Sequence, residues 1–510
     1  MYRSMRSVGR RTFIIGGVAA AATLTYGGRA GAASFPFKLG VASGDPESDS
    51  VVLWTRLAPS PLNTDGHGGM STSDVVVDWQ VSTSSTFGTL VASGSVTAHY
   101  ADAHSVHVIA GGLVPDTDYY YRFRAQGYIS PVGRTRTAPA LGSFGRDLVM
   151  AFASCAHYES GYYNAYRRMA EDQPGLILHL GDYIYEDGAT DGMVRLHIGS
   201  EIVSLADYRL RYALYKTDPD LQAAHAAAPW VVVPDDHEVE NNYANMVRAD
   251  SSPVLTADQW IARRTAAYQA YYENMPLRPS SAPSGNSIPL YRRIRWGNLA
   301  TFHMLDTRQF RDDQACGDGW KVCSDADLAT RTITGDAQEA WLLDGLAQHQ
   351  ATWDILGQQV FFARRFDSSG AGAMDAWDGY RASRARIQQG WVDRGVRNPV
   401  VLTGDVHMAW ANDLKADYTD TSSATIGTEL VCSSITSNGN GTGSTTIPDA
   451  STNPHIKFFY DQRGYVRTTI TPTHMQAEFR AVASVTEHGA PVSTVGSFVI
   501  ADGQPGLQQA

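Results

Sequence analysis

A carboxylate and a phenol follow the apolar run 176–180 at the point where that run meets a glycine. The run, LILHL, lies between a Pro-Gly turn and Gly181, a pattern typical of a buried strand. In the string GDYIYE, Asp182 and Tyr185 would share one face if the chain turns helically there. Such a pair could bind a hard, highly charged cation. An aspartate after a glycine is more often a turn or cap residue, and a tyrosine more often packs in a core.

Three other apolar runs deliver polar residues at their carboxyl ends. The residues concerned are Cys155 after 151–154, Asp235, Asp236 and His237 after 231–234, and Asp405 and His407 after 400–404. On an extended chain, Asp405 and His407 would point to the same side. Each residue alone has an ordinary structural explanation, such as a small core cysteine or a satisfied histidine. Four strand ends that share this chemistry predict a metal site, because open α/β sheets place ligands at the carboxyl ends of their strands.

The order SC…GDYIYE…DDHE…GDVH resembles the PhoD-type alkaline phosphatases and phosphodiesterases. This family is a branch of the calcineurin-like metallophosphoesterases and is related to purple acid phosphatases. The resemblance covers nearly the whole chain, including the opening GVASGDPESDSVVLWTR. Cysteine replaces the first aspartate of the commoner pattern, DDHE stands for GNHE, and GDVH stands for GHVH. These departures are those of the PhoD branch.

The resemblance implies two unlike metals. It assigns an Fe³⁺ ion to Cys155, Asp182, Tyr185 and His407, and a Ca²⁺ ion to Asp182, Asp236 and Asp405, with Asp182 bridging. A thiolate and a phenolate suit Fe³⁺, and carboxylates suit Ca²⁺. A further group, comprising Asp235, Asn241 and Asn242, is left open between a second calcium and a supporting role around the ligands.

The implied reaction is two-metal hydrolysis of a phosphate ester. Asp182 and His237 are the catalytic candidates, His237 as the general acid for the leaving alkoxide or as a stabiliser of the phosphoryl group. Phosphate monoesters are expected substrates, together with diesters. A phospholipase D-like phosphodiesterase on the same scaffold is the alternative. An exported binding protein with a degenerate site is a third hypothesis, and the complete set of competent ligands argues against it.

The elements that position these residues fall into two regions. Residues 37–139 consist of short runs rich in β-branched and aromatic residues, typical of a small β-sandwich, with a tyrosine entry at 113–119 like that of fibronectin type III domains. Strand and helix patterns alternate through 146–510. We therefore expect an α/β fold, a metallophosphoesterase αββα sandwich preceded by a small all-β fibronectin III-like domain.

The N-terminal residues 1–32 resemble a twin-arginine export signal. Arg10 and Arg11 precede a mild apolar stretch that falls short of the roughly 20 residues a membrane span requires. Cleavage would remove five arginines and no acids, which changes the formal charge from −11 to −16. So acidic a chain argues against a nucleic-acid partner. We expect a secreted monomer without a transmembrane span, exported by the twin-arginine machinery.

The four cysteines divide into a pair and two single thiols. Cys316 and Cys323 bracket the loop CGDGWKVC, and an oxidising exterior would favour their disulfide. Cys432 lies in an apolar run, which is typical of an inert core thiol. Cys155, as a metal ligand, must instead be a thiolate and cannot be bonded to Cys432.

Overall fold

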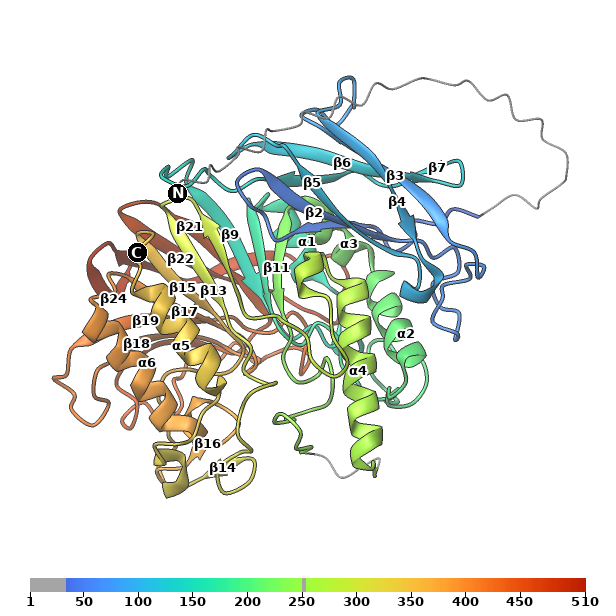
Figure 1. Ribbon diagram of the computed structural model, residues 1–510. Helices are drawn as coiled ribbons and strands as arrows, with labels where there is room; N and C mark the ends of the chain where they lie inside the picture. The colour runs from blue at the N-terminus through green and yellow to red at the C-terminus, as the bar shows by residue number, and fades with distance from the viewer. Residues whose placement is uncertain (1–33, 250–253) are drawn as a thin grey trace, which may run out of the picture. The chain divides into compact units, whose positions relative to one another are not determined.

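Two large β-sheets packed face to face form the centre of the protein (Figure 1). The computed structural model describes residues 34–249 and 254–510, so the predictions made for residues 1–32 lie outside the described residues. Residues from Phe35 to Ala510 form one compact unit. Side chains from the inner faces of both sheets, such as Phe152, Leu180, Phe302 and Leu402, make up the apolar layer between them.

The first sheet has ten strands and mixes parallel and antiparallel pairs. Its order is β24 (Gln504–Gln509), β23 (Val492–Ala501), β22 (His474–Val482), β21 (Gly464–Ile470), β9 (Leu148–Ala153), β10 (Leu176–Leu180), β11 (Pro229–Val233), β1 (Val41–Gly44), β2 (Ser50–Arg56) and β5 (Ser105–Gly111). The four central strands β9, β10, β11 and β1 are parallel to one another.

The second sheet has seven strands. Its order is β12 (Arg292–Trp296), β13 (Ala300–Met304), β15 (Trp353–Gly357), β17 (Pro399–Thr403), β19 (Thr425–Val431), β18 (Ala409–Lys415) and β20 (Ile456–Tyr460). Strands β13, β15, β17 and β19 are parallel and fully or largely buried, which explains their continuous apolar sequences.

Helices cover the outer face of each sheet, and the order of layers is helix, sheet, sheet, helix. Against the ten-stranded sheet pack α1 (Asn164–Glu171), α2 (Leu205–Lys216), α3 (Pro219–Ala227) and α4 (Ala257–Asn274). Against the seven-stranded sheet pack α5 (Gly335–Leu346) and α6 (Arg381–Arg394). Figure 1 shows the two helical groups on opposite sides of the sheets. The predicted αββα sandwich is therefore confirmed.

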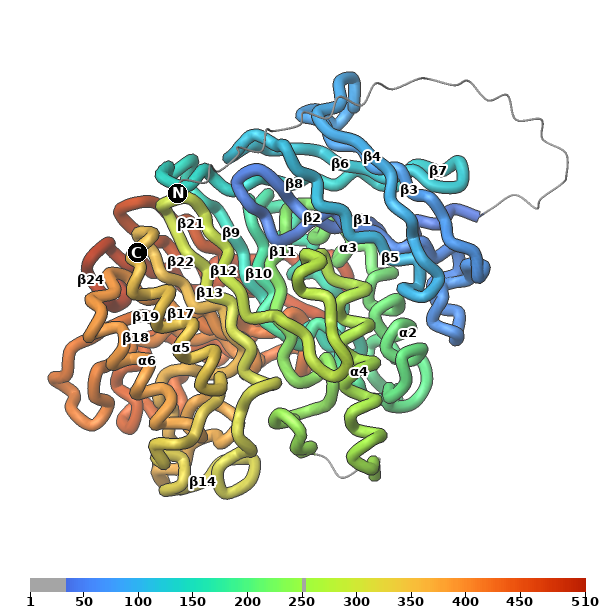
Figure 2. The backbone as a smooth tube through the Cα atoms, in the orientation of Figure 1, coloured from blue at the N-terminus to red at the C-terminus, as the bar shows by residue number. Residues whose placement is uncertain are grey.

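The N-terminal region is all-β, as predicted, but its strands do not form an isolated module. A separate five-stranded sheet contains β4 (Ala92–Ala98), β3 (Val75–Ser82), β6 (Asp118–Ala125) and β7 (Tyr128–Ile129), with β8 (Gly133–Arg136) paired to β6. It packs on β1, β2 and β5, which continue the ten-stranded sheet beyond β11 (Figure 2). Tyr119 Oη accepts a hydrogen bond from the Val114 N–H at 2.9 Å, a local tie at the predicted tyrosine entry. The domain limits 37–139 and 146–510 stay a prediction.

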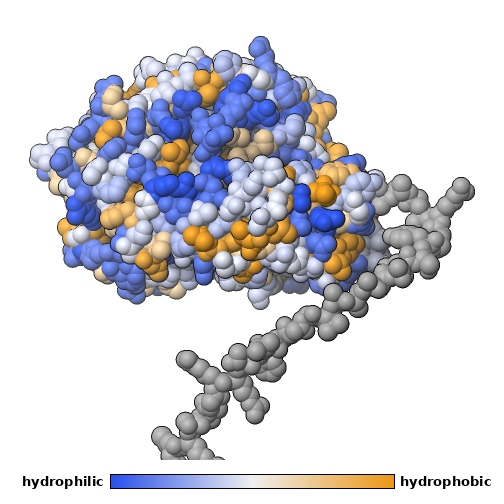
Figure 3. Space-filling view, turned by 90° about the horizontal axis from the view of Figure 1, so that it is seen from above, coloured by the Kyte–Doolittle hydropathy of each residue, from blue (hydrophilic) through white to orange (hydrophobic). Residues whose placement is uncertain are grey.

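Two features of the surface bear on the sequence predictions. No helix in the described ranges combines the length and apolar character needed to cross a membrane. On the face shown in Figure 3, hydrophobic residues are dispersed among hydrophilic ones.

Cys316 and Cys323 form a disulfide, with Cα atoms 6.1 Å apart, next to the short strands β14 (Trp320–Lys321) and β16 (Gly372–Ala373). The favoured pairing of these cysteines is confirmed.

Candidate metal centre

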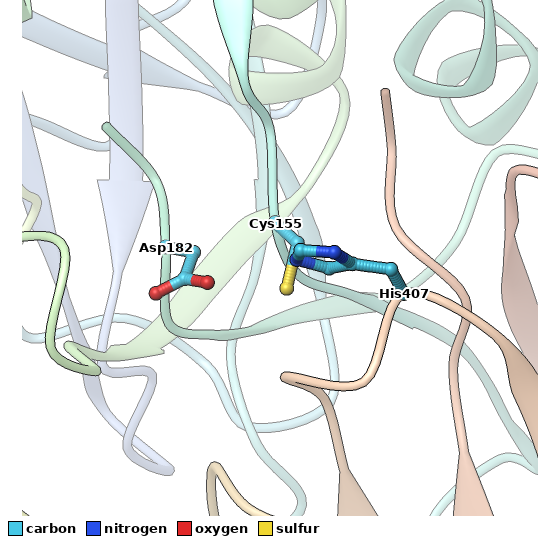
Figure 4. Close-up of side chains that lie close together, drawn as sticks. All are labelled: Cys155, Asp182 and His407. Atoms are coloured by element: carbon cyan, nitrogen blue, oxygen red, sulfur yellow. The ribbon is translucent and has the colours of Figure 1, made fainter. Parts of the chain in front are cut away.

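The predicted ligands meet where parallel strands of both sheets end. Cys155 follows β9, Asp182 follows β10, the run Asp235–His237 follows β11, and Asp405 and His407 follow β17. Ligand atoms of Cys155, Asp182 and His407 all lie within 4.8 Å of one another (Figure 4). Ligand atoms of Asp182, Asp236 and His237 form a second group with the same limit. Asp182 belongs to both groups, so its carboxylate lies between them.

The backbone at these positions adopts a conformation that side chains disfavour. The φ angles of Cys155, Asp182, Asp405 and His407 are 61°, 54°, 65° and 59°. Left-handed conformations outside glycine cost about 1–3 kcal/mol each, and they concentrate at functional sites. Four of them at four candidate ligands indicate that the surrounding packing holds the ligands in place.

The backbone differs in two places from the local conformations considered in the sequence, a helical turn at Asp182 and an extended chain at Asp405. Asp182 and Tyr185 do not lie on a helical turn, because the left-handed Asp182 redirects the chain. Asp405 and His407 are not on an extended chain, since both have positive φ. Tyr185 nevertheless reaches the site: its Oη–H donates to Asp182 Oδ2 at 3.1 Å, and it lies 3.2 Å from His407 Nε2.

Gly181 permits the close approach of two strand ends. Its φ is +104°, and a Cβ there would lie 2.4 Å from Asp235 Cβ and 2.7 Å from the Asp235 backbone nitrogen. Only glycine fits this conformation and this space. The "GD" of the motif therefore positions Asp182 against the end of β11.

Several buried carboxylate oxygens in the cluster have no hydrogen-bond partner. Among the described residues these are Asp182 Oδ1, Asp235 Oδ2 and Asp236 Oδ1, of which the last lies 3.5 Å from a terminal nitrogen of Arg308 without a hydrogen bond. A buried acceptor without a partner costs free energy, and more so when charged. Bound cations would satisfy these oxygens, so the donor set fits a metal centre.

The pKa shifts show the same need for positive charge. Burial, reinforced by the Asp182 charge, raises the pKa of the Cys155 thiol well above its usual value. Burial and the same carboxylate raise the pKa of Tyr185. Burial also raises the pKa of Asp182 itself. A thiolate, a phenolate and a carboxylate can coexist here only if cations offset their charges.

His237 is held by a residue that the sequence analysis did not single out. Its Nδ1 lies 2.7 Å from Glu186 Oε2, which leaves Nε2 as the ring nitrogen available to a ligand. Burial opposes a charged imidazole, but the carboxylates of Glu186, Asp236 and Asp182 outweigh it and raise the pKa of His237 well above 6.5. His237 lines a pocket of about 580 Å³ together with His157, Tyr185 and His407.

Arginine and glutamate anchors surround the carboxylates. Arg308 Nε donates to Asp235 Oδ1 at 2.5 Å, and its terminal nitrogens donate to both oxygens of Asp375 at 2.8 Å. The Glu238 carboxylate accepts hydrogen bonds from the backbone N–H groups of Asp182 and Asp235. These anchors were missed, although Arg308 follows strand β13, and the same search for polar residues after apolar runs could have found it.

The remaining predicted residues lie around the two groups. Asp405 is in neither group among the described residues; its pKa is raised by burial and then by the charges of Asp235 and Asp375. The backbone N–H of Asn241 donates to Glu186 at 2.6 Å, and that of Asn242 donates to Asp236 Oδ2 at 2.6 Å. The thiol of Cys432 is buried and free, 3.5 Å from Ser154 Oγ.

The layered sheets and the ligands at their strand ends define a metallophosphoesterase. Comparison with a solved plant structure agrees on the fold: purple acid phosphatase PPD1 from yellow lupin superposes with a TM-score of 0.55 at 12% identity, covering 91% of this chain and 73% of that one. The chain belongs to the PhoD-like phosphatase family, whose profile matches residues 150–479, while the profile of the family's N-terminal domain matches residues 20–139.

Two relatives are much more similar. Alkaline phosphatase D of Bacillus subtilis (strain 168) is 50% identical over 487 residues, which cover 93% of this chain and 82% of the relative. A solved structure of PhoD superposes with a TM-score of 0.90 at 50% identity, covering 94% of this chain and 92% of that one. The predicted family and fold are therefore confirmed, and the chain is a phosphoric ester hydrolase.

Proposed function

We propose that this phosphatase hydrolyses phosphate esters with an Fe³⁺ and a Ca²⁺ ion. Cys155, Asp182, Tyr185 and His407 would hold the iron, and Asp182, Asp236 and Asp405 would hold the calcium. The observation that carries this proposal is that Asp182 is common to two compact groups of ligand atoms, one with Cys155 and His407 and one with Asp236 and His237. Two such cations supply charge neutralisation for the phosphoryl oxygens and activation of the attacking water.

His237 is the proposed general acid. Its Nδ1 is fixed by Glu186, and the ring faces the pocket, so Nε2 can donate a proton to the leaving alkoxide. The same N–H could instead stabilise the transferring phosphoryl group. A His237→Gln variant distinguishes the roles: loss of general acid catalysis would slow alkyl esters more than aryl esters, whose leaving groups need less protonation.

Asp235, Asn241 and Asn242 are proposed to support the ligands and not to bind a second calcium. Arg308 occupies one oxygen of Asp235, and Asn242 contributes its backbone N–H to Asp236. Asp235→Asn should then change catalysis while the calcium content of the protein stays the same.

Both monoesters and diesters are proposed substrates. Elemental analysis, paired with rates on p-nitrophenyl phosphate and bis(p-nitrophenyl) phosphate, tests the proposal. We expect iron and calcium in the purified protein, a visible tyrosinate–Fe³⁺ absorption and loss of hydrolysis on treatment with EDTA. A protein that binds no metal, or that retains full activity in EDTA, would refute the proposed chemistry.

We also propose export through the twin-arginine pathway to an extracytoplasmic location, as a monomer. The Cys316–Cys323 disulfide supports an oxidising location. Replacing Arg10 and Arg11 together by lysine should retain the protein inside the cell, and light scattering of the secreted protein tests the monomer.

A further inference from the structure

The loop that carries His407 borders two cavities. His407 lines the 580 Å³ pocket, together with His157 and His237. Its two neighbours in sequence, Val406 and Met408, line a second cavity of about 480 Å³. The function proposed above makes use of the first pocket alone. The second cavity begins one residue away from the candidate ligands Asp405 and His407.

Arg365 is a cation in the second cavity that has no ion-pair partner among the described residues. Its guanidinium lies over three aromatic rings, 5.1 Å from the centre of Trp320, 4.7 Å from that of Phe361 and 5.4 Å from that of Trp410. Its Nε is buried without a hydrogen-bond partner. Arg308, in contrast, is ion-paired to three carboxylates, those of Asp235, Asp236 and Asp375. A half-buried, aromatic-flanked guanidinium that no carboxylate of the described residues pairs with is suited to an anionic ligand.

Trp320 forms an exposed wall of this cavity. Its side chain is 46% exposed although it lies in a strand, β14, that pairs with β16. The Cys316–Cys323 disulfide closes the loop that carries it. An exposed indole on a cross-linked loop offers a fixed stacking surface, which is the usual way in which proteins present aromatic contact area to ligands.

The cavity adjoins the metal centre along the chain, because the lining residue Val406 lies between Asp405 and His407. Burial lowers the pKa of Arg365, and the Asp405 carboxylate is the first of the charges that act in the opposite direction. Two carboxylates also border the cavity. Of these, Asp367 uses one oxygen to accept hydrogen bonds from Ser369 and Ala371, and Asp449 is exposed. Neither is ion-paired to Arg365, so the guanidinium remains available.

We propose that the Trp320–Arg365 cavity binds the alcohol part of the phosphate ester and selects alcohols that carry a ring and a negative charge. The ring would stack on Trp320, and the negative group would accept hydrogen bonds from Arg365. This inference rests on the proposed function, since it places the phosphoryl group at the metal centre.

Calorimetric binding of phosphonates to the metal-loaded protein tests the cavity without relying on turnover. The probes are methylphosphonate, benzylphosphonate and 4-carboxybenzylphosphonate, and we expect affinity to rise in that order. Trp320→Ala should reduce the advantage of benzyl over methyl by roughly three- to tenfold, the size of one aromatic contact. Arg365→Gln should reduce the advantage of the carboxylate by roughly tenfold. Trp320→Phe and Arg365→Lys should restore part of each advantage.

Two substitutions serve as matched controls. Arg397 is exposed and paired with Asp502, and Leu141 is an exposed apolar residue outside the cavity. Arg397→Gln and Leu141→Ala should leave all three affinities unchanged. Thermal unfolding of each variant establishes that it is folded.

The outcomes separate this inference from the proposed function. Equal affinities for the three phosphonates, or an order that both Trp320→Ala and Arg365→Gln preserve, would overturn the cavity's role even if p-nitrophenyl phosphate is hydrolysed. Selective binding that these variants abolish would support the cavity. If the same protein hydrolysed no phosphate ester, the proposed function would fail while the ligand preference stood.

Discussion

Glu238 offers the sharpest test of how the fold positions the metal centre. Its buried carboxylate accepts hydrogen bonds from three backbone N–H groups, those of Asp182 at 3.1 Å, Tyr183 at 2.6 Å and Asp235 at 2.8 Å. These donors come from the segments that follow β10 and β11. One side chain therefore joins the two strand ends that carry Asp182 and Asp236.

Burial raises the pKa of Glu238 to about 8, so at a pH above that value its replacement by glutamine keeps the shape and removes one acceptor oxygen. Oε2 of Glu238 accepts hydrogen bonds from the N–H groups of Asp182 and Asp235, and Oε1 accepts one from the N–H group of Tyr183. If the amide oxygen takes the Oε2 position, the amide nitrogen faces the Tyr183 N–H, donor against donor. Leaving one buried donor unsatisfied costs about 1–3 kcal/mol of unfolding free energy. Alanine would leave three donors unsatisfied and cost about 3–9 kcal/mol, comparable to the whole stability of many proteins.

Urea unfolding and elemental analysis together check this reasoning. We expect E238Q to unfold at lower urea concentration and, while still folded, to contain less iron and calcium per chain than the wild type. The loss of metal separates positioning of Asp182 from a general loss of stability. Glu487→Gln, a change at an exposed glutamate, is the matched control and should alter neither quantity.

Wild-type stability and metal content in E238Q would show that the three N–H contacts do not hold the ligands. Lower stability with full metal content would show that Glu238 supports the fold without positioning Asp182. Either result refutes the argument that Glu238 couples β10 to β11 at the site.

Three further changes test other parts of the structure. Cys155→Ser should lose iron and most activity, whereas Cys432→Ala should keep its iron; normal iron in Cys155→Ser would remove this residue from the ligand set. Gly181→Ala should strongly reduce both stability and metal content, because its Cβ would overlap Asp235, and a fully active variant would contradict the close approach of the two strand ends. Burial lowers the pKa of His179 to about 3, so the folded protein keeps this histidine neutral while the unfolded chain protonates it below about pH 6.5. The contribution of neutral His179 to the unfolding free energy is thus fully present above pH 6.5 and is lost towards pH 3, by up to about 1.4 kcal/mol per pH unit. His179→Gln should therefore flatten the pH dependence of the urea midpoint between pH 6.5 and pH 3. An unchanged slope in this variant would contradict the assignment of a neutral, buried His179.

The agreement between sequence and structure is greatest at the buried strands. The runs that end before Cys155, Asp182, Asp235 and Asp405 are strands β9, β10, β11 and β17 in the structure. Parallel strands buried on both faces have continuous apolar sequences, and their carboxyl ends meet at one edge. For this reason the residue types at the strand ends were sufficient to predict a joint site. Helices α2 and α3 were not predicted, although Ser204 and Asp218 cap their first turns, and both helices are buried through tertiary packing.

The sequence by itself determined which residues could bind metal and in which order they follow the strands. The tertiary structure alone decided how they are held. The left-handed backbone at Asp182 and His407 opposes local preference and requires the surrounding packing. The contacts of Glu238 and Arg308 span more than fifty residues of sequence, so no local pattern contains them. Buried donors and acceptors must find partners wherever the chain brings them together, and that meeting is a property of the folded protein.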